Sequence, residues 1–203
     1  MPRTFGVGDG YHSGRVTDER CGDHPDVFEP LHNDVEIADG GAEAGLLPSV
    51  PSGWNDALTG TDGPRMWDRV ISSEVARVSR YQRPATVVLI EFAGLDAHAR
   101  KWGIDVSERL FTQLARTLAV ELRASDHIAR IGRTRFAILL TETDEIAAIN
   151  IVERARAACE YQLGASDLVR VAIGWASPSS TTDLRASIQV ATERLTDELR
   201  ESP

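Results

Sequence analysis

The run Thr86-Val-Val-Leu-Ile-Glu-Phe92 constrains the fold more than any other part of this sequence. All of its residues except Glu91 are β-branched or apolar, without the alternation of a strand that has one wet face. Such a run is typical of a central strand covered on both sides, so the chain must supply helices for two faces of a sheet. It is far shorter than the roughly 20 residues that a membrane helix needs.

Apolar spacing after Asp56 predicts helices and strands in alternation. Four predicted helices begin near Asp62, Asp105, Asp144 and Asp183, and end near Arg83, Leu122, Gln162 and Leu199. We expect Asp62 to cap the first helix and Asp105 with Glu108 to form a capping box in the second. In the third helix the residues expected to face inward are Ile146, Ile149, Val152 and Cys159.

The remaining apolar runs are strands. The runs 127–131 and 135–140 are joined by Gly132-Arg133-Thr134, which is the layout of a β-hairpin, and 168–175 is a further strand. The order helix, strand, helix, hairpin, helix, strand, helix predicts an α/β or α+β sandwich in which helices cover a mixed sheet. The tryptophans Trp67, Trp102 and Trp175 are expected in core or edge packing.

Residues 1–54 differ in composition from the rest. The segment 1–55 has ten acids against three bases, and so carries −7 of the net charge of −9. It also holds nine of the 16 glycines and five of the nine prolines. We expect residues 1–54 to be a disordered acidic tail, which serves as a partner-binding arm, as a cap over a basic groove, or only as a solubilising segment.

Charge, cysteines and the first residues bound the location and the partners. A net charge of −9 argues against a general affinity for nucleic acid or for an anionic membrane surface. Cys21 and Cys159 are too few for a disulfide framework and are expected to be free thiols. Residues 1–10 lack the pattern of an export signal, so we expect a cytoplasmic protein.

Four strings occur in the order known from one family. They are Asp56-Ala-Leu-Thr-Gly60, Gly103, Arg130-Ile-Gly132 followed by Phe136, and Ala172-Ile-Gly174-Trp-Ala176. With them, residues 55–200 resemble a GGDEF domain, the diguanylate cyclase fold that is similar to the catalytic palm of class III nucleotide cyclases. The resemblance implies a palm-like mixed sheet with a central β-hairpin. It also implies a link to cyclic di-GMP.

The residues that the family uses for catalysis are altered. Joining two GTP molecules is a phosphoryl transfer in which carboxylates hold Mg²⁺ ions. Where the family reads GG(D/E)EF, this chain reads Gly132-Arg133-Thr134-Arg135-Phe136, and Glu91 is the only residual acid at a family metal position. The guanine-recognising asparagine and aspartate become Ala99 and Arg100, and the tyrosine and lysine of the last helix become Ala191 and Arg194.

These departures predict a protein without catalytic residues, without a metal site and without a cofactor. The alternative is an active diguanylate cyclase that uses Glu91, unconventional ligands and Mg²⁺. His98 near Glu91 is not expected to bind a metal, because no second histidine lies at helical spacing from it.

One functional string of the family remains. Arg123-Ala-Ser-Asp126 matches the RxxD product-inhibition site in its spacing from Gly132. The resemblance implies that Arg123 contacts a phosphate and the guanine edge of cyclic di-GMP, and that Asp126 accepts hydrogen bonds from guanine. The alternative is local: Arg123 stabilises the end of the preceding helix and Asp126 caps the turn.

Three arginines of the hairpin form a second candidate site. Arg130, Arg133 and Arg135 can hold an anion or the acids of a partner protein, or they can pair with local carboxylates. The sequence as a whole therefore predicts a non-catalytic signalling module that binds cyclic di-GMP or a protein partner. A homodimer is a further expectation, although no heptads precede the domain.

Overall fold

The computed structural model describes residues 51–164, 166–179 and 183–201. The expectations for Cys21 and for nearly all of the acidic segment 1–54 lie outside these described residues. Within the described ranges, none of the helices combines the length and the apolar character that crossing a bilayer requires.

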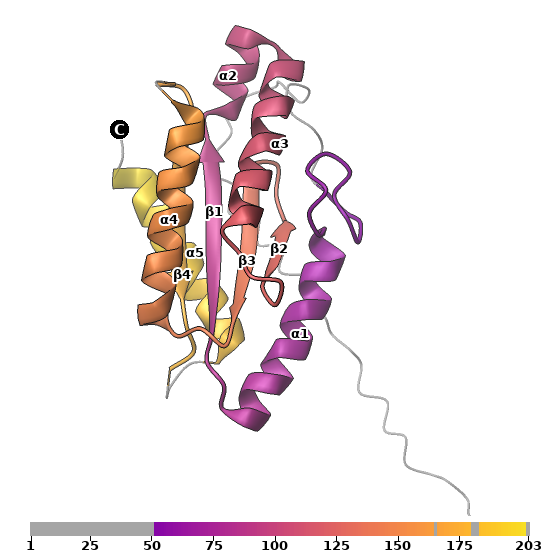
Figure 1. Cartoon of the computed structure of the whole chain (residues 1–203), viewed down its shortest axis with the longest axis vertical. Coiled ribbons are helices and arrows are strands. Elements are labelled where there is room, and N and C mark those ends of the chain that lie inside the picture. The colour runs from indigo at the N-terminus through magenta and orange to yellow at the C-terminus, as the bar shows by residue number, and fades with distance from the viewer. Residues whose placement is uncertain (1–50, 165, 180–182, 202–203) are drawn as a thin grey trace, which may run out of the picture. The chain divides into compact units, whose positions relative to one another are not determined.

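Four strands form one sheet in the order β2-β3-β1-β4 (Figure 1). They span Ala85–Ala93 (β1), His127–Arg130 (β2), Arg135–Thr141 (β3) and Arg170–Ala176 (β4). β1 pairs along its length with both β3 and β4, which confirms the predicted central strand. The hairpin is also confirmed, but it is not central: β3 lies inside the sheet and β2 forms its edge.

The expectation of a mixed sheet is wrong in one respect, because every ladder is antiparallel. The helices between β1 and β2 return the chain so that β2 runs parallel to β1, but β3 lies between these two strands. The two parallel strands are therefore never neighbours. Among the described residues, the parallel pairing outside the ladders is the isolated bridge between Asp62 and Ala129.

The described residues form five helices, which pack around the sheet. They span Pro64–Tyr81 (α1), Leu95–Trp102 (α2), Ile104–Val120 (α3), Glu145–Leu163 (α4) and Leu184–Glu201 (α5). In Figure 1, α3 and α4 lie in front of the sheet and α5 lies behind it. The short helix α2 was not expected, because its eight residues offer only two turns of spacing.

Alternate side chains of β1 enter two separate cores. Val88, Ile90 and Phe92 pack with α3 and α4, whereas Val87 and Leu89 pack with α1 and α5. Residues 85–90 are at most 3% exposed, as a strand covered on both faces requires.

The prediction of which α4 residues face the sheet is correct for Val152 and Cys159 and wrong for Ile146 and Ile149. Ile146 and Ile149 are 78% and 43% exposed, and the buried residues are Ala148, Val152, Ala155 and Cys159. The small alanines, rather than the large isoleucines, let α4 lie close to the sheet. Trp67 is buried as expected, but Trp102 is 56% exposed at the end of α2.

The observed helix caps differ from the two that were predicted. Asp144 caps α4, since its carboxylate accepts a hydrogen bond from the amide of Ala147 at 2.7 Å. The caps predicted at Asp62 and Asp105 are wrong, because Gly63 and Gly103 stand at the N-caps of α1 and α3 without a side-chain cap.

Candidate functional site

The carboxyl end of β1 lies beside the turn of the hairpin. Glu91 is directly opposite Arg135 in the ladder between β1 and β3. The amide of the next residue, Phe92, donates to the carbonyl of Thr134 at 3.1 Å. The strand register therefore brings the residual acid against the turn where the sequence departs from the family.

Both carboxylate oxygens of Glu91 have partners in this turn. Oε2 accepts a hydrogen bond from Nε of Arg135 at 2.7 Å, and Oε1 accepts one from the hydroxyl of Thr134. The Glu91 and Arg135 side chains are 14% and 27% exposed. A charge-assisted bond in such a half-buried place is stronger than a neutral one, so the charge of Glu91 is balanced within the protein.

The side chains at this end of the sheet do not fit the Mg²⁺ ions that the resemblance implies. Magnesium is bound by several oxygen ligands in near-octahedral geometry, usually with one or two carboxylates. Beside Glu91 this turn offers a neutral hydroxyl and a guanidinium. Among the described residues, no group of three or more His, Cys, Asp or Glu side chains is placed to hold a metal ion.

Arg130 is not a surface contact, and its expected role with an anion or a partner is corrected. Its side chain is 1% exposed, and Nη1 pairs with Oδ1 of Asp56 at 2.9 Å. Nε and Nη2 donate to the carbonyl of Arg133 at 3.2 and 2.8 Å, and the guanidinium lies over the ring of Phe111. Arg130 therefore ties the segment of Asp56 to the hairpin.

Asp56 has a structural role that sequence reasoning did not assign. Its Oδ2 accepts hydrogen bonds from the amide and the hydroxyl of Thr59, at 2.9 and 2.6 Å. Its Oδ1 holds Arg130, which lies 74 positions further along the chain. The signal that could have found this pair is the occurrence of both residues in strings shared with the family.

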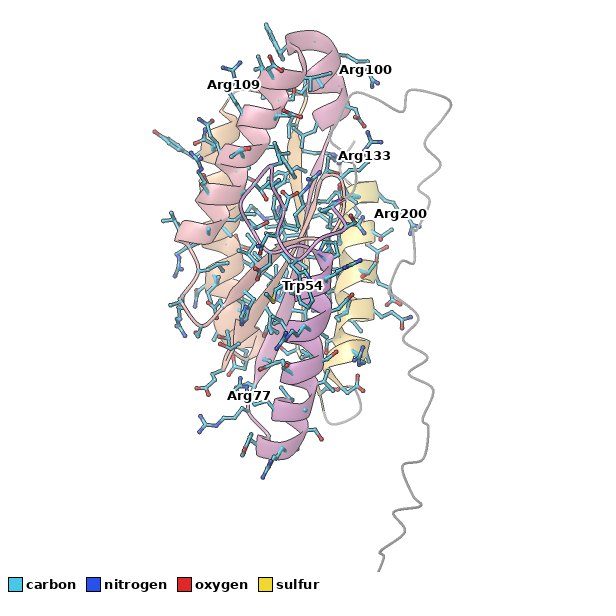
Figure 2. The ribbon with its side chains drawn as sticks, turned by 90° about the vertical axis from the view of Figure 1, so that its right-hand side faces the viewer. Trp54, Arg77, Arg100, Arg109, Arg133 and Arg200 are labelled. Atoms are coloured by element: carbon cyan, nitrogen blue, oxygen red, sulfur yellow. The ribbon has the colours of Figure 1, made fainter. Side chains whose placement is uncertain are left out.

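The other altered positions lie in different surroundings. Ala99 is 3% exposed in α2, whereas Arg100 next to it is exposed (Figure 2). Ala191 packs against β4, where a Cβ added to Gly174 would lie 2.1 Å from the Ala191 carbonyl oxygen. Arg194 pairs with Glu145 of α4 at 2.6 Å. Contact of Arg133 or Arg135 with an anion or a partner stays a prediction.

Arg123 and Asp126 lie together in the turn between α3 and β2. Oδ2 of Asp126 accepts a hydrogen bond from the amide of Arg123 at 2.9 Å, and Oδ1 accepts one from the amide of Thr141 at 3.2 Å. The carboxylate thus caps the turn, while the Arg123 side chain is exposed. Because a carboxylate has about four acceptor positions, the cap leaves acceptor capacity on Asp126.

A second guanidinium lies beside this turn, and sequence reasoning missed it. Arg154 on α4 donates from Nε to Oε2 of Glu121 at 2.9 Å and from Nη2 to the Glu121 carbonyl at 3.2 Å. Glu121 is the C-cap of α3 and precedes Arg123 by two positions. Only the packing of α3 against α4 brings Arg154 here, so no local pattern could have found it.

His98 is bonded within the helical layer. Its Nδ1 lies 2.6 Å from the hydroxyl of Ser107, which also donates to the carbonyl of Gly103 at 3.2 Å. Burial lowers the pKa of His98, and the nearby charge of Lys101 lowers it further. A buried neutral imidazole with a hydroxyl partner is a packing residue, so this arrangement gives no reason to assign a metal to it.

Comparison with known proteins gives consistent matches. A family model described as "Diguanylate cyclase, GGDEF domain" matches residues 54–201. A probable diguanylate cyclase, DgcC of Escherichia coli, is 31% identical over 99 residues, which are 49% of this chain and 27% of that protein. The chain thus spans about a quarter of the length of this relative.

Solved structures show the same fold. The diguanylate cyclase SiaD of Pseudomonas aeruginosa, in complex with its activator SiaC, superposes with a TM-score of 0.67 at 23% identity, over 75% of this chain and 60% of that one. The GGDEF domain of DgcB from Caulobacter crescentus, in complex with c-di-GMP, superposes with a TM-score of 0.68 at 13% identity, over 74% and 92% of the two chains.

Proposed function

Because the chain belongs to the GGDEF domain family over residues 54–201, we propose that it is a catalytically inactive module in cyclic di-GMP-linked regulation. It acts by binding cyclic di-GMP at Arg123 and Asp126, or by binding a protein partner. The observation that carries the proposal is the bonding of Glu91, whose two carboxylate oxygens are bonded to Thr134 and Arg135.

The chemistry of the family explains why this bonding matters. Phosphoryl transfer between two nucleotides needs metal ions that offset the charge developing on the phosphates. At the family's metal position this chain has a carboxylate that is paired with an arginine. Arg133 also replaces the glycine that lets a substrate approach the turn. The hairpin is thus a structural turn without cyclase activity.

The turn at Arg123 supports ligand binding. Cyclic di-GMP carries two phosphates and two guanines, which match guanidinium forks and carboxylate acceptors. Arg123 is exposed, Asp126 keeps acceptor capacity, and Arg154 adds a second guanidinium from α4. DgcB, which shares the fold, is described in complex with c-di-GMP, and this motivates the choice of ligand.

A protein partner is the second candidate. The observation that favours it is the local cap, because both oxygens of Asp126 already hold backbone amides. SiaD, which has the same fold, is described in complex with its protein activator SiaC. In this case Arg123 and Asp126 shape the turn and the ligand does not bind there.

Calorimetry with cyclic di-GMP distinguishes the two candidates. We expect saturable binding at micromolar concentration that is lost in Arg123→Ala and kept in Arg200→Ala, which removes an exposed arginine of α5. If no heat is measured at high ligand concentration, the turn does not bind cyclic di-GMP, and binding of a protein partner is the candidate function that stands.

A GTP assay tests catalytic inactivity. With Mg²⁺ and GTP we expect no cyclic di-GMP from the unaltered chain. Turnover that depends on Mg²⁺ and disappears in Glu91→Ala would instead establish the active cyclase.

A further inference from the structure

The exposed residues on the outer face of α1 are basic or uncharged. Its exposed residues between positions 65 and 80 are Arg65, Arg69, Ser72, Ser73, Ala76, Ser79 and Arg80. At 100° per residue they form one stripe about 120° wide, and at 1.5 Å per residue it is about 22 Å long. At the same spacing the half-buried Asp68 borders the stripe, about 20° beyond Ser79, and Glu74 is 6% exposed.

The arginines of this stripe are not neutralised by ion pairs in the part of the chain that the structure describes. Glu74 is bound by Arg77, at 2.8 Å from Nε and 2.6 Å from Nη2. The ion pairs among the described residues do not include Arg65, Arg69 or Arg80. A chain of net charge −9 thus presents a locally positive helix face.

Two exposed aromatic rings hold arginines of the stripe in place. The guanidinium of Arg69 lies 6.0 Å from the ring centre of Trp54, and that of Arg80 lies 5.3 Å from that of Tyr81. Trp54 and Tyr81 are 46% and 60% exposed. Stacking on a ring leaves the N–H edge of a guanidinium open to carboxylates, and Trp, Tyr and Arg are the residue types that dominate binding at protein interfaces.

A neighbouring helix extends the basic surface. Nη2 of Arg185 on α5 donates to the hydroxyl of Ser72 at 3.3 Å, which places another arginine beside the middle of the stripe. Figure 2 looks onto α1, with Trp54 beside the start of that helix. The small side chains between the arginines let another chain lie close to the helix.

We propose that the outer face of α1, with Trp54 and Tyr81 at its ends, binds an acidic segment of a partner protein. Several carboxylates spaced along about 20 Å of the partner match the three arginines of the stripe in charge and in spacing. The net charge of −9 favours such a short acidic segment over nucleic acid, which is a long and dense polyanion. This surface goes beyond the proposed function, because it contains neither Arg123 nor the hairpin turn.

A binding assay with defined probes tests this surface in the full chain. The probes are fluorescein-labelled peptides of about twelve glutamates or twelve glutamines and a single-stranded DNA of about twelve nucleotides, read by fluorescence anisotropy. The test variant is Arg65→Gln/Arg69→Gln/Arg80→Gln. The matched control, Arg109→Gln/Arg116→Gln/Arg200→Gln, removes the same charge from exposed positions on α3 and α5.

We expect the glutamate peptide to bind the unaltered chain at least tenfold more tightly than it binds the α1 variant, with a change below about twofold in the control variant. The glutamine peptide should not bind. Equal losses in both variants, no binding of the glutamate peptide at about millimolar concentration, or tighter α1-dependent binding of the DNA would each overturn the proposal. Circular dichroism checks that both variants fold. Calorimetry should give the same heat of cyclic di-GMP binding for the α1 variant and the unaltered chain, so a failure of this surface is distinguishable from a failure of the proposed function.

Discussion

At the scale of single residues, the pair of Arg130 and Asp56 shows what a buried charge does in this domain. The two side chains are 1% and 6% exposed. Removing charges from water costs several kcal/mol, and the attraction within a pair offsets this only when the remaining donors and acceptors are also bonded. Here the Arg133 carbonyl and the Thr59 side chain complete the bonding, so the pair fixes the position of the hairpin.

A double-mutant cycle measures this pair. Arg130→Met should lower the free energy of unfolding by about 3–5 kcal/mol, because Asp56 stays buried without its cation. Asp56→Asn should also destabilise, since it leaves Arg130 unpaired. The double variant should lose at least about 1 kcal/mol less than the sum of the single losses in urea titrations. Strictly additive losses would contradict the pairing.

The hairpin turn should gain a metal site when its acids are restored. In Thr134→Asp/Arg135→Glu, two new carboxylates join Glu91 and the competing guanidinium is removed. We expect about 10 mM Mg²⁺ to raise the Tm of this variant by about 3–5 °C and to leave the unaltered chain unchanged. Arg200→Glu, which adds an acid to α5, should show no shift. A magnesium-dependent rise in the unaltered chain would contradict the bonding described for Glu91.

His98 should make stability depend on pH between about 5 and 7. Burial lowers its folded-state pKa below 6.5, so below pH 6.5 the unfolded chain takes up a proton that the folded chain excludes. Stability therefore falls as the pH falls through this window, by at most about 1.4 kcal/mol per pH unit. In urea titrations from pH 7 to 5, His98→Asn should reduce the dependence of the free energy of unfolding on pH. If this dependence stays the same in the variant, groups other than His98 cause it. Asp62 acts oppositely and nearer pH 4, because burial raises its pKa.

At the scale of elements, the periodicity of the sequence predicted each long helix and each strand, because burial on one or two faces leaves a pattern along the chain. It failed in two details, the N-caps and the inner face of one helix. Gly63 and Gly103, which have no capping side chain, stand at the N-caps where Asp62 and Asp105 were expected, and alanines rather than Ile146 line the inner face of α4. Such choices depend on how closely neighbouring elements approach, which one segment does not encode.

The candidate site was predictable to a different degree. The shared strings alone show that Thr134 and Arg135 stand where the family motif has its two acids. The fates of Arg130 and Arg135 do not, because both lie on the hairpin at similar spacing. Arg130 is buried against Asp56, whereas Arg135 forms a half-buried pair with Glu91, and only the long-range strand and loop contacts distinguish the two.

A glycine between β1 and α2 shows how tight one such approach is. Gly94 has φ 89°, and a Cβ there would lie 1.8 Å from the carbonyl oxygen of Leu168. Gly94→Ala should therefore cost more than about 3 kcal/mol of unfolding free energy, since backbone must move. Gly60→Ala is the matched control: it has φ 74° and nothing within 4 Å, so about 1–2 kcal/mol is expected. Equal losses in urea titrations would contradict the close approach at Leu168.

At the scale of the whole described domain, the two candidate regions lie at opposite ends of the sheet. Asp126 holds the amide of Thr141, which pairs with Ala85 at the start of β1, whereas Glu91 pairs with Arg135 near its end. Six residues of strand separate these positions by about 20 Å. Under the proposed function, altered residues at the hairpin end therefore need not disturb the turn of Arg123 and Asp126 at the other end.

This separation predicts that changes at the two ends are independent. Arg123→Ala and Thr134→Asp/Arg135→Glu share no bonded partner, so in the combined variant their effects on the free energy of unfolding should add within about 0.5 kcal/mol. The same combination should leave Mg²⁺ stabilisation at the hairpin unchanged relative to Thr134→Asp/Arg135→Glu alone. Urea titrations with and without Mg²⁺ measure both quantities. A coupling above about 1 kcal/mol would mean that the sheet transmits changes between its ends. The turn of Arg123 and Asp126 would then depend on the residues of the hairpin, contrary to the prediction.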